Sequence, residues 1–109
     1  MKEMMNELTS LKQLDEIKES SAVSVLVFSA NWCPDCRFIE PFMPALIKRY
    51  SDYQFYYINR DEWMQVCVEF NVMGIPSFVA LRNGEEIGRF VSKNRKTEAE
   101  IDAFLQSLK

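Results

Sequence analysis

A chain of 109 residues is long enough for one compact domain and too short for two, so residues 1–109 are expected to form a single domain. Apolar residues make up 48% of the chain and charged residues 27%, which is ordinary for a soluble globular protein, and a net charge of −3 argues against a nucleic-acid-binding protein. The absence of histidine excludes histidine-based acid–base catalysis and metal sites that contain histidine.

The amino-terminal residues resemble neither a secretory signal nor a membrane anchor. Charged residues interrupt the apolar ones throughout residues 1–20, and no window of the chain reaches the roughly 18 apolar residues of a membrane span. We therefore expect a cytoplasmic protein, whose thiols are kept reduced. Its three cysteines then need a chemical explanation rather than a structural disulfide framework.

The first predicted elements in chain order are a helix and a buried strand. Thr9 or Ser10 can cap the helix, whose apolar face carries Leu11, Leu14 and Ile17. Residues 22–29 form an apolar, valine-rich run of strand length, which is typical of a strand covered on both faces.

A longer helix, an aromatic strand and another helix come next. The longer helix begins close to Cys33 and continues to about Tyr50, with a kink expected at Pro41, and the strand covers residues 53–59. Asp61 can open the next helix, whose inward positions at helical spacing are Trp63, Val66, Cys67 and Phe70.

The last part of the chain predicts a hairpin. Residues 77–81 and 86–91 are apolar runs on either side of Asn83-Gly84, and this dipeptide is a strong signal for a two-residue hairpin turn. The two strands of the hairpin must therefore be antiparallel.

A final helix is predicted from its capping pattern. Thr97 is followed three residues later by Glu100, as in a capping box, and the apolar face of the helix carries Ile101, Phe104, Leu105 and Leu108. Parallel β–α–β units followed by an antiparallel hairpin indicate an α/β protein with a mixed sheet and helices on both faces.

The residues that carry chemistry are two cysteines at the predicted start of the longer helix. A helix amino terminus stabilises a thiolate, and Pro34 suits the first turn because its missing N–H costs nothing there. The two-residue spacing lets Cys36 reach back and resolve a mixed disulfide formed by Cys33. We expect Cys33 at an exposed lip as the attacking thiol, Cys36 more deeply buried, and Trp32 beside them as an apolar contact surface.

Two other interpretations of the cysteine pair are a zinc site and a pair of inert core thiols. A zinc site would need two further ligands, for which only Cys67 and carboxylates are left. Inert core cysteines do occur, but they rarely stand beside Trp and Pro at a strand–helix junction. Redox chemistry is favoured, with no metal. Cys67 itself is expected to be an inert buried thiol, and residues 93–96, rich in Lys and Arg, a solvated loop.

Four features in this order resemble the thioredoxin family over nearly the whole chain: Trp32-Cys33-x-x-Cys36, Pro41, Gly74-Ile75-Pro76 and Asn83-Gly84-Glu85. The resemblance implies the thioredoxin fold, a three-layer αβα arrangement with a mixed sheet of four to five strands and about four helices. It also implies that Pro76 is cis and packs against the sulfurs, and that the Ile75 backbone pairs with an extended substrate strand. Gly74 would let that strand approach.

The chain departs from the family pattern around the thiols. Val27 stands where family members commonly carry a buried Asp, and Tyr57 replaces the Lys that often accompanies it. The residues between the cysteines are Pro34-Asp35 rather than Gly-Pro. We hypothesise that Asp35 partly replaces the missing acid as a proton relay, the alternative being an ordinary residue of the first helical turn.

The sequence therefore predicts an enzyme, a thiol–disulfide oxidoreductase that reduces disulfides through the Cys33/Cys36 couple in cell redox homeostasis. It needs no bound cofactor. The resemblance implies recycling by a thioredoxin-reductase-type flavoenzyme, with disulfide-containing proteins or low-molecular-weight thiols as substrates; we expect a monomer that binds neither nucleic acid nor membrane. Alternatives are a thioredoxin-fold adaptor with slow turnover and a reductant selective for small-thiol mixed disulfides.

Overall fold

The structure is a computed structural model that describes residues 2–109. The strands are β1 (Asn6–Glu7), β2 (Ser24–Ser29), β3 (Gln54–Asn59), β4 (Ser77–Arg82) and β5 (Glu85–Phe90). The helices are α1 (Leu11–Glu19), α2 (Pro34–Ile39), α3 (Met43–Arg49), α4 (Met64–Glu69) and α5 (Glu98–Ser107), preceded by one turn of 3-10 helix at Lys2–Met4. Within residues 2–109, no helix is long and apolar enough to cross a bilayer.

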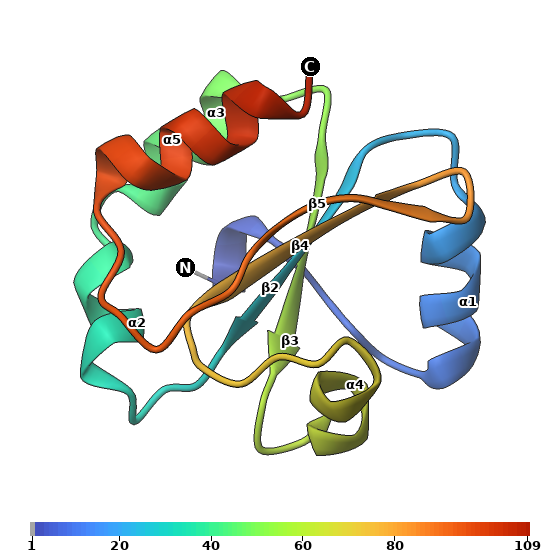
Figure 1. The fold of residues 1–109 in the computed structure, drawn as a ribbon, viewed down its shortest axis with the longest axis horizontal. Helices are drawn as coiled ribbons and strands as arrows, with labels where there is room; N and C mark the ends of the chain where they lie inside the picture. The colour runs from blue at the N-terminus through green and yellow to red at the C-terminus, as the bar shows by residue number, and fades with distance from the viewer. Residues whose placement is uncertain (1) are drawn as a thin grey trace.

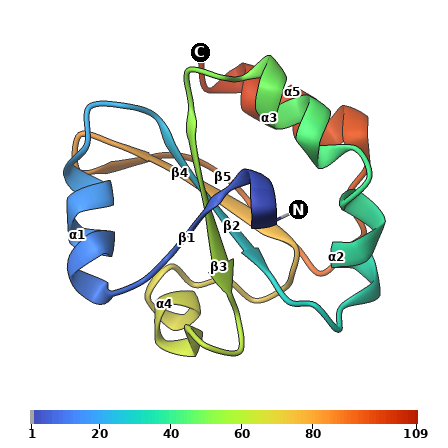
Figure 2. The same ribbon diagram turned by 180° about the vertical axis from the view of Figure 1, so that it is seen from behind.

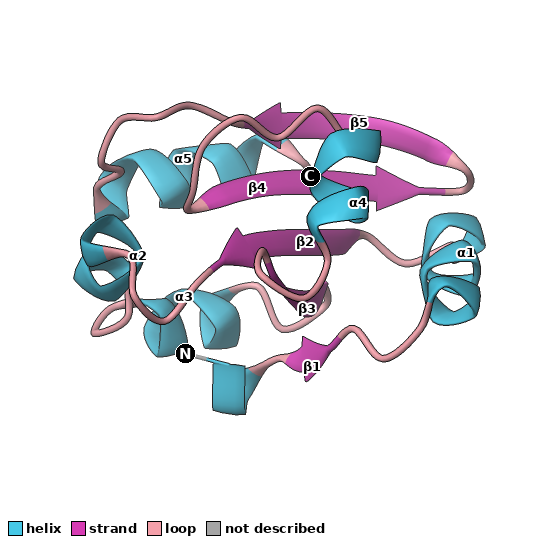
Figure 3. Ribbon diagram, turned by 90° about the horizontal axis from the view of Figure 1, so that it is seen from below, coloured by secondary structure: helices cyan, strands magenta, loops and turns pink. Residues whose placement is uncertain are grey.

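The five strands form one mixed sheet in the order β1-β3-β2-β4-β5 (Figure 3). Strand β3 is parallel to β1 and β2, whereas β4 is antiparallel to both β2 and β5. The predicted mixed sheet is confirmed, and the short edge strand β1 adds a fifth strand that no pattern in the sequence had indicated. All six residues of β2 are buried, as expected for a central strand covered on both faces.

Helices cover both faces of the sheet and divide the core in two. One face carries α3 and α5 side by side, together with the end of α2 (Figure 1 and Figure 2). The other face is covered by α1 and α4. Because side chains alternate along a strand, Val25 and Val27 of β2 face the first layer, whereas Leu26 and Phe28 face the second.

The local signals for caps and turns hold in the structure. Ser10 caps α1, its hydroxyl accepting a hydrogen bond from the Gln13 N–H at 3.0 Å. Thr97 and Glu100 form the predicted capping box of α5. Asn83 and Gly84 take positive φ angles of 52° and 80°, as a two-residue hairpin turn requires.

The predicted long helix from Cys33 to Tyr50 is wrong in one respect, because it is two helices. Pro41 has no N–H to donate, and the Phe42 N–H instead reaches back to the Ile39 carbonyl at 3.3 Å, which closes a tight turn between α2 and α3. Pro44 then lies in the first turn of α3, where a proline costs no hydrogen bond. The break accounts for a helix count above the four expected.

The start of α4 also differs from the prediction. The helix begins at Met64, with Trp63 as its N-cap residue, rather than at Asp61. Asp61 instead lies in the turn after β3, where its N–H is bonded to the Asn59 side chain at 2.9 Å. That turn leaves the Asp61 carboxylate available to another part of the chain.

Candidate active site

The two cysteines of the motif lie where the central strand β2 gives way to α2. Cys33 is the N-cap residue of α2, Pro34 occupies the first turn, and both thiols are free. Cys36 is 1% exposed and Cys33 is 7% exposed, so the predicted order of burial is confirmed. The predicted exposed lip is wrong, because Cys33 is buried as well.

The segment before β4 packs directly against the thiols. Ile75 contacts the small buried cluster formed by Ala30, Cys33 and Cys36. The Cys33 thiol donates to the Ile75 carbonyl, with a sulfur–oxygen distance of 3.8 Å, and the Ile75–Pro76 peptide bond is cis. Two segments far apart in the sequence thus meet at the sulfurs.

Gly74 lies at a close approach of two backbone segments. A Cβ atom at this position would stand 2.5 Å from the Ser92 carbonyl oxygen and 2.9 Å from the Lys93 Cα, both closer than real Cβ atoms come. The glycine therefore has a packing reason within the fold, in addition to the substrate approach expected from the sequence.

Trp32 is an exposed aromatic residue directly before Cys33. The residue is 54% exposed, yet its indole N–H donates to the Asp61 carboxylate at 2.8 Å and the Arg60 guanidinium stands 5.7 Å from the ring centre. These two contacts fix the orientation of a large apolar surface next to Cys33. Pro34 is exposed on the same segment.

Asp35 is held by an ion pair with a residue from the far end of the chain. The Arg95 Nε donates to the Asp35 carboxylate at 2.9 Å, and the guanidinium stands 4.4 Å from the centre of the Phe38 ring. The carboxylate beside the thiols is therefore paired with a cation rather than free in solvent.

Lys96 contradicts the expectation of a solvated loop at residues 93–96. It is 1% exposed, and its ammonium group donates to the carbonyls of Ser92 and Asn94, each at 3.1 Å, while facing the Phe90 ring at 5.3 Å. Burial lowers the pKa of Lys96, opposed by the charges of Asp35, Cys36 and other nearby groups. The loop thus brings a buried cation within electrostatic reach of the thiols.

Comparison with known proteins identifies the family. The thioredoxin family model matches residues 5–107. The chain belongs to the thioredoxin family. Thioredoxin H2 of Arabidopsis thaliana is 42% identical over 81 residues, which are 74% of this chain and 61% of that protein. Thioredoxin H-type 1 of Brassica napus is 37% identical over 93 residues, 85% of this chain and 73% of that protein.

Solved thioredoxins share the fold. The thioredoxin of Trypanosoma brucei brucei superposes with a TM-score of 0.85 at 21% identity, over 95% of this chain and 89% of that one. A thioredoxin from Nicotiana alata superposes with a TM-score of 0.81 at 28% identity, over 97% and 93% of the two chains. The predicted thioredoxin fold is confirmed.

Membership of the thioredoxin family implies a thiol–disulfide oxidoreductase of the protein-disulfide reductase kind. Thioredoxins use a redox-active dithiol and need no cofactor, and Cys33 and Cys36 have the spacing of that dithiol. Within residues 2–109, no cluster of three or more Cys, Asp or Glu side chains is placed to hold a metal ion.

The surroundings of Cys36 differ from the family pattern expected from the sequence. Val27 is fully buried in the apolar core, and Tyr57 lies opposite it on β3 at 3% exposure. Burial raises the pKa of the Cys36 thiol to about 12, and burial also raises the pKa of the Tyr57 hydroxyl. Cys36 thus lies beside Ser29 and Ala30, neutral residues at the end of β2 and just after it.

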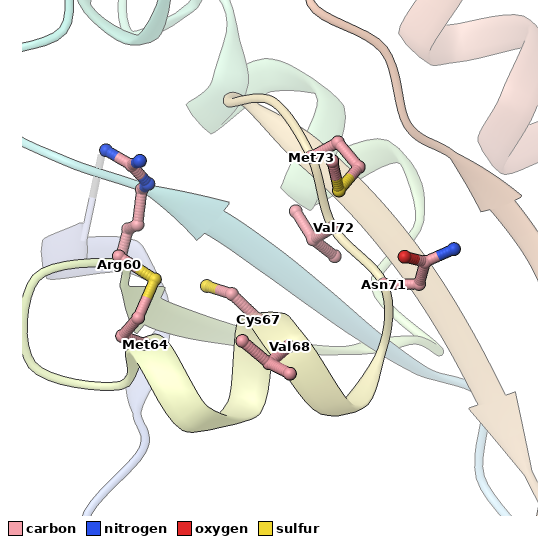
Figure 4. A pocket seen from close by; sticks show the side chains of 7 residues that line it. All are labelled: Arg60, Met64, Cys67, Val68, Asn71, Val72 and Met73. Atoms are coloured by element: carbon pink, nitrogen blue, oxygen red, sulfur yellow. The ribbon is translucent and has the colours of Figure 1, made fainter.

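Cys67 lies in the core between α4 and the sheet. It is 3% exposed, and burial raises the pKa of its thiol. Figure 4 shows it among the residues that line a pocket of about 290 Å³, together with Met64, Val68 and Val72. A protonated, buried thiol agrees with the inert role expected of it.

Sequence reasoning missed the partners that fix the site. Asp61 orients Trp32, Arg95 holds Asp35, and Lys96 is buried near the thiols. No spacing in the sequence links these pairs, because each contact depends on the tertiary fold. One signal was available for Ser29, a polar residue at the end of an otherwise apolar strand just before the motif.

Proposed function

We propose that this chain is a dithiol reductant of protein disulfides, in which Cys33 attacks and Cys36 resolves. The Cys33 thiolate attacks a substrate sulfur to form a mixed disulfide, and Cys36 then displaces the reduced product and closes the Cys33–Cys36 disulfide. The observation that carries this proposal is the pair of free thiols at the start of α2, both buried, of which Cys33 at 7% exposure is the more accessible and Cys36 at 1% the less.

The burial of Cys36 supports this division of roles. Because the pKa of Cys36 is raised to about 12, this cysteine is a protonated thiol at neutral pH and is a poor first nucleophile. It becomes reactive once the mixed disulfide lies next to it, where the reaction is intramolecular and favoured by proximity.

The substrate is proposed to dock on the surface around Cys33. Trp32 and Pro34 supply exposed apolar contacts on one side, and the Ile75 backbone, next to the cis Pro76, would pair with an extended substrate segment on the other. Gly74, next to Ile75, carries no side chain, which we propose leaves room for that substrate segment.

The physiological setting is part of the same proposal. A dithiol reductant needs continuous re-reduction, and family membership supports a thioredoxin-reductase-type flavoenzyme as the donor, with the cytosol as the compartment and redox homeostasis as the role. We propose low-molecular-weight mixed disulfides as substrates beside protein disulfides, and a monomer as the working form.

Reduction of insulin disulfides in the presence of dithiothreitol tests the function. Cys33→Ser should abolish the rate above background, and Cys36→Ser should trap a mixed disulfide that mass spectrometry detects. Cys67→Ser is the matched control and should retain the wild-type rate. Full activity in Cys33→Ser would overturn the proposal, and the reduction potential of the Cys33–Cys36 couple separates a reductant from a disulfide-forming oxidase.

A further inference from the structure

The Ser29 hydroxyl is a buried polar group that the fold leaves unpaired. Ser29 is 1% exposed, and its Oγ makes no hydrogen bond of ordinary geometry to any group within residues 2–109. Leaving a buried hydroxyl unpaired costs about 1–3 kcal/mol, so such a group needs an explanation. Ser24, on the same strand, has the same property and serves as a comparison.

The position of Ser29 places it beside the resolving thiol. It is the last residue of β2, and strand alternation turns it to the same face as Val25 and Val27, the face on which α2 lies. The Cys36 thiol and the Tyr57 hydroxyl are both near enough for the Ser29 hydroxyl to stabilise their ionised forms, which lowers the pKa of each against the effect of burial.

Among residues 2–109, no Asp or Glu side chain is buried in the core. Val27 fills the position where the family pattern places an acid, and it is fully buried among apolar side chains. A carboxylate next to Cys36 would disfavour a second negative charge on the sulfur, whereas a neutral hydroxyl can donate a hydrogen bond to it.

We propose that the Ser29 hydroxyl donates a hydrogen bond to the Cys36 sulfur as that sulfur becomes a thiolate, taking the place of a buried acid. When that hydrogen bond forms, the Tyr57 hydroxyl, protonated at neutral pH, would donate in turn to the Ser29 oxygen and orient it. The inference rests on the proposed function, because it concerns the second step of disulfide exchange.

The resolving step balances with Ser29 as a hydrogen-bond donor only. Cys36 gives up its proton to solvent, its sulfur forms a bond to the Cys33 sulfur, and the bond between Cys33 and the substrate sulfur breaks. The bonding electrons leave with the substrate sulfur, which takes up a proton from solvent. The substrate is thereby reduced and the dithiol oxidised, while Ser29 keeps its own proton and stabilises the charge that develops on Cys36.

Other ionisable groups act on this cluster and must be kept constant in any test. Cys33 and Lys96 act electrostatically on Cys36, Glu40 and Glu7 act on Tyr57, and Asp35 acts on Lys96. Ser29→Ala leaves all of them in place, and Ser24→Ala is its matched control because it removes the other unpaired hydroxyl of the same strand.

Stopped-flow reaction with dithiobis(nitrobenzoate) separates the two steps, because the attack and the resolution each release one coloured thiolate. Ser29→Ala should slow the second release about tenfold at neutral pH, the effect of one pKa unit, and leave the first release unchanged. The pH profile of the second step should move to higher pH by about one pH unit. Ser24→Ala should match wild type in both steps, and Ser29→Thr, which keeps the hydroxyl, should recover the second.

Three outcomes would count against these proposals in different ways. Equal second-step rates in Ser29→Ala and Ser24→Ala would overturn the assignment of Ser29. Equal slowing of both steps in Ser29→Ala would also overturn it, because that result indicates a general structural effect. Absence of the first release in the wild-type protein would instead refute the proposed function itself.

Discussion

Alkaline pH should destabilise the reduced protein through Cys36. The folded chain raises the pKa of this thiol from 9.0 to about 12 because the side chain is buried. A thiol whose pKa is raised by folding contributes stability below its unfolded pKa, and that contribution is lost as the pH rises through the folded value. The window for the effect is therefore pH 9 to about 12.

The expected size follows from the same values. Within this window the unfolded chain carries a Cys36 thiolate and the folded chain a thiol, so the free energy of unfolding falls by about 1.4 kcal/mol for each pH unit. The full loss is about 4 kcal/mol, and a loss of about 2 kcal/mol is expected by about pH 10.5. A loss of that size is a large part of the stability of a small domain.

Urea unfolding of the reduced protein between neutral pH and about pH 10.5 measures the effect, with a phosphine reductant to keep the thiols reduced. Cys36→Ser is the matched variant, since its hydroxyl does not titrate in this range and every tyrosine and lysine is retained. The difference in free energy of unfolding between the two proteins should be constant below pH 9 and then shrink. Parallel curves over the whole range would show that folding does not raise the Cys36 pKa, and would refute the reasoning.

Three further predictions follow from single contacts. If Asp35 relays a proton, Asp35→Asn should shift the acid limb of the pH–rate profile for insulin reduction, and an unchanged limb would end that hypothesis. Asp61→Ala removes the hydrogen bond that orients the Trp32 indole and should raise the KM for insulin about threefold. The rate of the first thiolate release from dithiobis(nitrobenzoate) should stay unchanged. An unaltered KM would contradict the orienting role. Thr97→Ala removes the cap of α5 and should lower the free energy of unfolding by about 1 kcal/mol in urea, whereas equal stability would show that the capping box contributes nothing.

The parts of the fold that were predictable depend on local chemistry. A capping box, an Asn-Gly turn and a valine-rich central strand each determine a few neighbouring residues, and all three occur where expected. The cysteine pair was recognisable for the same reason, since its chemistry depends on spacing along the chain and on the start of α2.

The predictions that are wrong concern residues whose environment is determined by contacts between distant parts of the chain. Lys96 lies in a charged run that predicts exposure to solvent. In the structure its ammonium group instead donates to two backbone carbonyls and contacts an aromatic ring. Asp61 is a residue type that favours helix caps, but its carboxylate instead accepts a hydrogen bond from the Trp32 indole. Pro41 was expected to kink a helix, and with Pro44 starting a new first turn soon after, the helix divides instead.

The two departures from the family pattern belong to one structural unit. Val27 and Tyr57 are directly paired across β2 and β3, so the residues that the family commonly has there, an Asp and a Lys, would also be neighbours. Losing one member of a buried ion pair leaves an unpaired charge that costs about 3–5 kcal/mol, whereas replacing both with well-packed neutral residues is often neutral or stabilising. Replacing both residues together, as Val27 and Tyr57 do here, is therefore compatible with a stable core, whereas replacing one alone is costly. It also leaves Cys36 without an acid on the sheet, and the unpaired hydroxyl beside its thiol is that of Ser29.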